Sequence, residues 1–119
     1  MPTIIENRRN LHQIPEIELT TQKTAQYIEN VLDLYDCTID HPIQNSVTAF
    51  FDNKKEKTIV FRSDMDALPM EENTNLTFKS TNGCMHACGH DGHMAMVLEL
   101  AKYAKESDYN VLLLFQPGE

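Results

Sequence analysis

The sequence has few basic residues, few chain-breaking residues and no long apolar run. Its 119 residues include 4 Gly and 5 Pro, and 10 Lys and Arg stand against 18 Asp and Glu, which gives a formal charge of -8. A nucleic-acid surface needs clustered cations that displace the counterions of the phosphates, so this charge argues against that function. No apolar segment approaches the roughly 20 residues needed to cross a bilayer. We therefore expect neither a nucleic-acid partner nor a membrane partner.

The first residues also lack the basic stretch followed by an apolar stretch that marks a signal peptide. We therefore expect a cytoplasmic protein. Cys37, Cys84 and Cys88 are an odd number of cysteines, and the last two stand among histidines. This usage fits a reducing compartment, with thiols free to bind metal, better than a disulfide framework.

The composition, 41% apolar and 24% charged, is that of a single globular domain. Thr3 and Glu6 form a capping-box pattern that predicts a first helix ending near Gln13. Apolar residues spaced by three or four predict a second helix that is capped by Thr20 or Thr21, reaches residue 35 and lies on a sheet. Residues 93–105 are apolar on nearly every side, which predicts a buried helix with Asp91 as its N-cap.

Three short segments have the composition of strands. The segments 47–51 and 58–61, separated by a polar turn, are predicted to be neighbours. The apolar run 111–115 suits an interior strand covered on both faces. Helices alternating with strands indicate a layered α/β domain, whose active residues belong at strand ends and in the loops that follow. Residues 64–91 show no period and form an unusually long loop, which in a compact domain is usually functional.

Two carboxylates stand where the strand 58–61 should end. Asp64 and Asp66 project to the same side if the strand persists that far, and such a pair suits metal binding or proton transfer. The simpler interpretation is a turn with surface aspartates, because Asp is common where turns begin.

A dense group of metal-ligand residue types occupies residues 84–93, with two Cys, three His and one Asp in ten positions. Thiolate and imidazole are the preferred zinc ligands. Cys88 and His90 can converge on one metal ion if Gly89 lets the backbone bend between them.

Other interpretations of this segment remain open. Cys84, Cys88, His90 and His93 could form a structural zinc site, although the usual long spacer between ligand pairs is missing. The two cysteines could be a redox pair, although their spacing has one residue too many. His86 and His93 could simply be hydrogen-bonded packing histidines.

A last carboxylate, Glu119, follows the apolar run and Pro117-Gly118. This order places it at the carboxyl edge of a strand, where α/β proteins put their sites. A terminal Glu is otherwise expected to be exposed and frayed.

Four motifs together resemble a known family. They are residues 8–16 (RRNLHQIPE), 62–69 (RSDMDALP), 85–93 (MHACGHDGH) and 115–119 (FQPGE). In this order they are similar to the hippurate hydrolase branch of the zinc peptidase, aminoacylase and carboxypeptidase superfamily. That branch includes N-acyl amino acid amidohydrolases, auxin-conjugate hydrolases and N-acetyl-diaminopimelate deacetylases.

The resemblance implies a two-metal amide hydrolase that acts on N-acyl amino acids or small peptides and forms homo-oligomers. Its catalytic domain would be a layered α/β/α domain interrupted by a smaller lid or dimerisation domain. Cys88 and His90 match metal ligands of the family, Glu119 matches the general base, and Asp66 matches an aspartate that supports the metal site. The metal ions would be Zn, with Ni, Co and Mn as alternatives.

The chain also departs from the family. The last motif of the family continues with a second, metal-binding glutamate and later histidines, which the sequence does not contain. We therefore expect residues 1–119 to be the amino-terminal part of the catalytic domain, truncated, metal-free and inactive alone. Thr20, Thr21 and Gly118 replace acidic residues and an alanine that relatives often carry. The competing hypothesis is a self-standing, non-catalytic metal-binding or interaction module that uses residues 84–93.

Overall fold

The sheet is built around the apolar run near the end of the chain. A computed structural model describes residues 1–118. Its sheet has four strands in the order β1 (Thr38–Asp40), β2 (Val47–Phe51), β4 (Asn110–Gln116) and β3 (Thr58–Asp64). β1 with β2 and β2 with β4 pair antiparallel, whereas β3 and β4 are parallel. The fold is therefore α/β with a mixed sheet, as the sequence predicted.

The prediction that β2 and β3 are neighbours is wrong, because β4 lies between them. β4 is the most apolar strand, and in this position both of its edges are paired, one with β2 and the other with β3. The polar residues between β2 and β3 therefore connect two strands that do not touch, instead of forming a hairpin turn. The short strand β1, at the open edge beside β2, was not predicted because three residues carry too little pattern.

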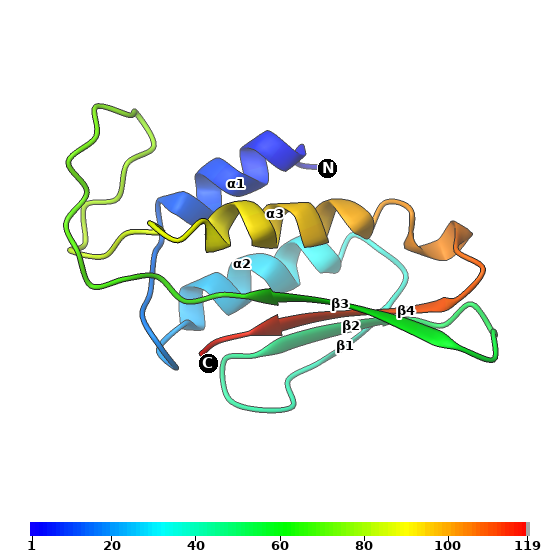
Figure 1. Cartoon of the computed structure of the whole chain (residues 1–119). Helices are drawn as coiled ribbons and strands as arrows, with labels where there is room; N and C mark the ends of the chain where they lie inside the picture. Colours follow the sequence, from blue (N-terminus) through cyan, green and yellow to red (C-terminus); the bar gives the residue numbers. More distant parts are fainter. Residues whose placement is uncertain (119) are drawn as a thin grey trace.

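Three helices, α1 (Ile4–His12), α2 (Gln22–Leu32) and α3 (His90–Leu100), lie on one face of the sheet (Figure 1). The capping box of α1 is confirmed. The Thr3 hydroxyl accepts the Glu6 amide at 3.1 Å, and the Glu6 carboxylate accepts the Thr3 amide at 3.2 Å. These two bonds satisfy amides that would otherwise have no partner at the start of the helix.

α2 begins after Thr21, but the Thr21 side chain makes no capping bond. The carboxylate of Glu16 replaces it and accepts the backbone amides of Lys23 at 3.2 Å and Thr24 at 2.8 Å. A negative charge at this end also suits the helix dipole. Glu16, which belongs to the first motif, thus fixes the start of the second helix.

α3 begins at His90, three residues earlier than predicted, and ends at Leu100, before a 3-10 turn over Ala104–Glu106. Its N-cap is Gly89, not Asp91. Gly89 has φ +82°, a left-handed conformation that glycine adopts readily and other residues do not. Asp91 lies in the first turn of the helix.

The core lies between the helices and the sheet. Alternate residues of β2 and β4 face the helices, so that Ala49, Phe51, Leu113 and Phe115 are fully buried. The helices contribute Leu11, Ile28, Leu32, Met94 and Leu98 to the same cluster. Each large apolar side chain buried in this way stabilises the fold by about 1.5–3 kcal/mol.

The other face of the sheet is not covered by any helix of residues 1–118 (Figure 1). On this face, Val60 of the edge strand β3 is 52% exposed. The sequence predicted that residues 111–115 are covered on both faces, and the described part of the chain covers one. Among these residues, no helix is both long and apolar enough to cross a membrane.

Candidate functional site

The carboxyl ends of β3 and β4 and the start of α3 lie at the same end of the molecule (Figure 1). Asp64, the last residue of β3, is opposite Gln116 in β4. The pairing continues one residue further, because the Met65 amide donates to the Gln116 carbonyl at 2.8 Å. Asp66 and Gly118 therefore leave adjacent parallel strands at the edge where α/β proteins place their sites.

His90, the first residue of α3, lies against the end of β3. Its Nδ1 is 2.8 Å from the backbone carbonyl oxygen of Asp66 and 3.3 Å from Oδ1 of the same residue. Its Nε2 is 3.9 Å from Oδ2 of Asp64. A carbonyl can only accept, so Nδ1 donates and the lone pair of the neutral ring is at Nε2. This is the tautomer that a metal-binding histidine adopts when a carbonyl orients it.

The structure thus brings three of the predicted residues together, namely Asp64, Asp66 and His90. Asp66 contacts His90 through its backbone carbonyl, a contact that the resemblance did not specify. Its buried Oδ1 lies 3.3 Å from Nδ1 of His90 but accepts no hydrogen bond among residues 1–118, because Nδ1 donates to the nearer carbonyl. A buried, unpaired carboxylate oxygen is costly, and it marks a place where a cation or a proton donor fits.

Cys88 is exposed and lies two residues before His90, with left-handed Gly89 between them. Thiolate and imidazole nitrogen fit a borderline-soft cation such as zinc, but two such groups do not complete a coordination sphere. Within residues 1–118, no three His, Cys, Asp or Glu side chains gather closely enough to hold a metal ion. The four-ligand structural zinc site is therefore not formed within the described residues.

A hollow of about 380 Å³ adjoins this edge and is lined by Glu18, Leu19, Asp66 and Gly118. A methyl group added to Gly118 would meet Leu19 at 3.5 Å, an ordinary contact, so the alanine of relatives would fit here. The predicted general base, Glu119, lies outside the described residues.

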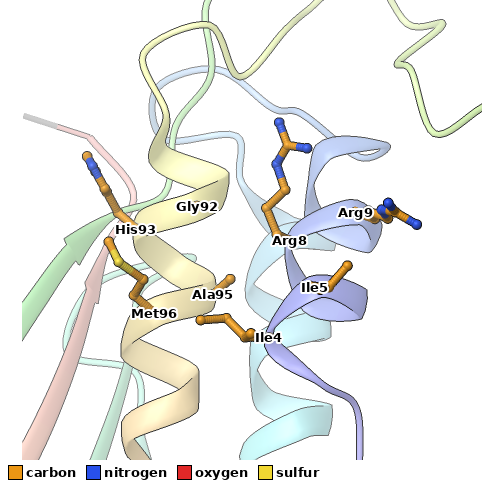
Figure 2. A pocket seen from close by; sticks show the side chains of 8 residues that line it. All are labelled: Ile4, Ile5, Arg8, Arg9, Gly92, His93, Ala95 and Met96. Carbon is orange, nitrogen blue, oxygen red and sulfur yellow. The ribbon is translucent and has the colours of Figure 1, made fainter. Parts of the chain in front are cut away.

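A second hollow, of about 490 Å³, runs between α1 and α3 (Figure 2). Ile4 and Ala95 face each other across it, while Arg8 and Arg9 project at its end. His93, a candidate ligand of the structural zinc site, lines this groove. Cys88, His90 and Asp66 do not. Of the predicted site residues, Asp66 lines the smaller hollow.

Behind His90 lies a buried ionic network that joins three distant segments. His12, at the end of α1, is 2% exposed. Its Nδ1 is 2.8 Å from Oδ2 of Asp91, and its Nε2 is 2.9 Å from Oε1 of Glu72. Nε of Arg8 also reaches Oδ2 of Asp91, at 3.0 Å. Both ring nitrogens of His12 therefore face carboxylates.

Glu72 comes from the middle of the long loop and is 4% exposed. Burial opposes its ionisation, but donors from the Thr74 hydroxyl, the Ser80 amide and His12 outweigh burial and lower its pKa to about 2. The carboxylate is therefore charged at neutral pH and gathers both sides of the loop around itself. The loop is also held from outside, because Phe78 packs edge-on against His12, with ring centroids 5.7 Å apart.

His86 is 4% exposed, and neither of its ring nitrogens has a hydrogen-bond partner among residues 1–118. Burial lowers its pKa to about 4, so the ring is neutral at pH 7. The sequence allowed a packing histidine at this position, and the structure shows one that is packed but not hydrogen-bonded.

Sequence reasoning missed the roles of His12, Glu16 and Glu72. His12 and Glu16 stand in the first motif, residues 8–16, so the motif itself marked them as candidates. From the sequence alone, neither residue received a structural role. Glu72 had no signal, because a single carboxylate in a polar loop resembles any solvated residue.

The chain is similar to a known protein family, to curated proteins and to solved structures. The model of "Peptidase family M20/M25/M40" matches residues 60–119. The chain is 43% identical to N-acetyldiaminopimelate deacetylase of Lactococcus lactis subsp. cremoris, over 100% of this chain and 34% of that protein. It is 40% identical to an uncharacterized hydrolase of Staphylococcus epidermidis, over 95% of this chain and 31% of that protein.

Among solved structures, the chain resembles a Bacillus subtilis protein described as a dinuclear metal binding peptidase from the M20 family. The TM-score is 0.86 at 36% identity, covering 98% of this chain and 34% of that one. The chain thus spans about a third of the length of the relatives it matches.

Proposed function

Because the chain belongs to peptidase family M20/M25/M40, we propose that the protein is a metal-dependent amidohydrolase that cleaves the acyl–nitrogen bond of N-acyl amino acids or small peptides. The observation that carries the proposal is the His90–Asp66 contact at the carboxyl edge of the sheet. This contact leaves Nε2 of His90 free to bind a metal ion, in a segment that also presents the exposed Cys88 thiol.

Cys88 and His90 would hold part of a site for two divalent metal ions, of which zinc suits the thiolate and imidazole donors. Bound metal would supply Lewis-acid polarisation of the amide carbonyl and a lowered pKa for water. We propose that the remaining ligands lie outside residues 1–118, since no three His, Cys, Asp or Glu side chains in these residues lie close enough together to hold a metal ion.

The residues of this chain would divide the remaining work. His90 is kept in one tautomer by the Asp66 carbonyl. The Asp66 carboxylate lines the hollow and presents an acceptor towards His90. Glu119 would take a proton from the attacking water and deliver it to the leaving amine, as a general base that becomes a general acid.

The proposed substrate class is supported by a relative that is named as an N-acetyldiaminopimelate deacetylase. An acylated amino acid offers an amide next to a carboxylate, and it is small enough to enter a hollow of about 380 Å³. We further propose that residues 1–119 form the amino-terminal part of a cytoplasmic, homo-oligomeric enzyme's catalytic domain, with the lid or dimerisation domain elsewhere in the protein.

The proposal is tested with the complete protein and a panel of N-acetyl and N-benzoyl amino acids. Ninhydrin detection of the released amine would be read together with metal content by mass spectrometry. Cys88→Ala should lose metal and turnover together, because it removes a charged ligand. Cys84→Ala is the matched control and should keep both. Equal metal loss from the two variants would contradict the assignment of Cys88, and no hydrolysis of any N-acyl substrate by the metal-loaded protein would contradict the function.

A further inference from the structure

The first turn of α3 is held by a residue that the proposed chemistry does not use. Asp91 directly follows His90, and its Oδ1 accepts the Gly92 amide at 2.9 Å. Its Oδ2 accepts Nδ1 of His12 at 2.8 Å. The exposed fraction of both residues is 2% or less, so the bond between them is shielded from water.

This bond constrains the direction of His90 by helix geometry. Successive residues of an α-helix point about 100° apart. While Asp91 is fixed towards α1, the preceding side chain must point towards the end of the sheet, where it meets Asp66. A rotation of the first turn would break both contacts at once.

His12 also reaches the loop that joins Asp66 to Cys88. Its Nε2 bonds both carboxylate oxygens of Glu72, at 2.9 and 3.1 Å, and Glu72 accepts the Ser80 amide at 2.8 Å. Arg8 bonds Asp91 as well, but its side chain is 40% exposed. Its guanidinium lies over the Phe78 ring of the loop, 5.3 Å from the centroid, and not against the Glu72 carboxylate. His12 is the side chain that bonds both the helix start and the loop.

From this geometry we propose that His12 is a positioning residue. Resting on the proposed function, the inference is that His12 bridges Asp91 and Glu72 and thereby sets the tautomer and aim of His90 and the place of Cys88, without touching metal or substrate. The buried bridge links α1, the long loop and α3. The geometry of the ligand segment therefore depends on a helix about 80 residues earlier in the chain. Groups that hydrogen-bond around metal ligands in this way orient the ligands without binding the metal.

Two variants separate the two bonds of His12. Asn places its amide nitrogen near the position of Nδ1, so His12→Asn can keep the bond to Asp91 and lose the bond to Glu72. Gln extends further and approximates Nε2, so His12→Gln can keep Glu72 and lose Asp91. The matched control is His41→Gln. His41 also bridges two acceptors, the Ser46 carbonyl at 2.7 Å and Glu29 at 2.9 Å, but it lies beside α2, away from α3.

The first readout does not need metal. Long-range ¹H–¹⁵N spectra of the ¹⁵N-labelled full chain, recorded without metal, report the His90 tautomer. Wild type should show Nδ1–H alone. His12→Gln should show mixed tautomers or shifted His90 ring signals, His12→Asn a smaller change, and His41→Gln none.

The second readout is zinc affinity in the complete protein, measured by competition with a chromophoric chelator. We expect His12→Gln to bind zinc about 10- to 100-fold more weakly than wild type, with His41→Gln unchanged. Unaltered His90 signals and zinc affinity in folded His12→Gln would overturn the proposal, as would equal changes in His41→Gln.

If neither His12 variant folds, Glu72→Gln provides the test, because it keeps the size while it removes the charge and replaces one of the two acceptor oxygens that bond His12 with a donor. Its His90 signals should then shift, and unshifted signals would overturn the proposal. Since the ring spectra are recorded without metal, they stand even if the complete protein hydrolyses no N-acyl substrate. The positioning role and the proposed function can therefore fail separately.

Discussion

Nδ1 of His90 lies 2.8 Å from the backbone carbonyl oxygen of Asp66, although 24 positions separate the two residues in the chain. The bond comes from the main chain, so no side-chain substitution at position 66 removes the acceptor itself. This separates two roles of Asp66: its carbonyl orients His90, and its carboxylate lines the hollow.

Asp66→Asn in the complete protein should therefore keep metal binding and lose activity. The His90 tautomer should persist, while loss of the supporting charge lowers turnover by about 10- to 100-fold. Metal content and steady-state hydrolysis of an N-acyl amino acid would be measured on the same preparation. Loss of metal in parallel with turnover would show that the carboxylate, and not the carbonyl, secures the ligand.

Glu119→Gln in the complete protein should abolish turnover without releasing metal. The amide keeps the size but cannot accept a proton, and loss of a general base typically removes a factor of ~10² to 10⁴ in rate, equivalent to about 3 to 5 kcal/mol. The check is kcat together with metal stoichiometry, with Cys88→Ala as the comparison that should lose both. Near-native turnover, or metal loss like that of Cys88→Ala, would remove Glu119 from its role.

Gly89→Ala and Gly92→Ala should have opposite effects on stability. A Cβ at either position meets no atom within 4 Å, so only backbone conformation distinguishes them. Gly89 has φ +82°, and alanine there should destabilise the fold by about 1 kcal/mol. Gly92 is helical, and alanine should stabilise it by about 0.4–1 kcal/mol. Urea unfolding measures both, and equal signs would contradict the left-handed start of α3.

Glu72 should make the free energy of unfolding depend on pH in the acid range. Its pKa in the folded protein, about 2, lies below the ordinary 4.5. The ionised carboxylate therefore stabilises the fold fully above pH 4.5, and this contribution is lost as the pH falls from 4.5 towards 2. The difference in unfolding free energy between wild type and Glu72→Gln should shrink over that interval.

Thr74→Val gives an intermediate case, because it removes one donor to Glu72 and leaves the Ser80 and His12 bonds. Its pH dependence should fall between those of wild type and Glu72→Gln. Denaturant titrations at several pH values supply the comparison, and a constant difference between wild type and Glu72→Gln would show that Glu72 has an ordinary pKa.

The 119-residue chain alone should associate through the edge of β3. Val60 is 52% exposed on this edge strand, and unpaired strand edges pair readily with other chains. Sedimentation velocity should show dimers or larger species whose share rises with concentration. Val60→Lys should reduce that share while circular dichroism stays unchanged, whereas a wild-type chain that remains monomeric at all concentrations would refute the expectation.

Most of the elements could be predicted because their signals are local. The Thr3–Glu6 box and the spacing of Ala25, Ile28 and Val31 depend on neighbouring residues alone. Strand order could not be read in this way. A polar turn between two strands is equally compatible with a hairpin and with a connection over a strand that arrives 50 residues later, and only the tertiary burial of β4 decides between them.

The site divides in the same manner. Residue types selected Cys88, His90 and Asp66, because metal chemistry restricts the choice of side chain. The supports could not be selected, since a backbone carbonyl has no residue type and the bridge through His12 spans 79 positions to Asp91. Whether Gly89 or Asp91 is the N-cap of α3 depends on the backbone conformation at these residues. The sequence restricts this conformation but does not determine it.

The central place of β4 has a consequence for the order in which the protein folds. β4 is synthesised after both of its neighbours, β2 and β3, which make no pairing with each other. On the ribosome, β1 and β2 can pair early, but β3 has no partner until residues 110–116 have emerged. Until then the Asp66 edge is not aligned and the backbone of β3 stays unpaired, so formation of the site waits for a pairing between segments distant in the sequence, which is the slow step of such topologies.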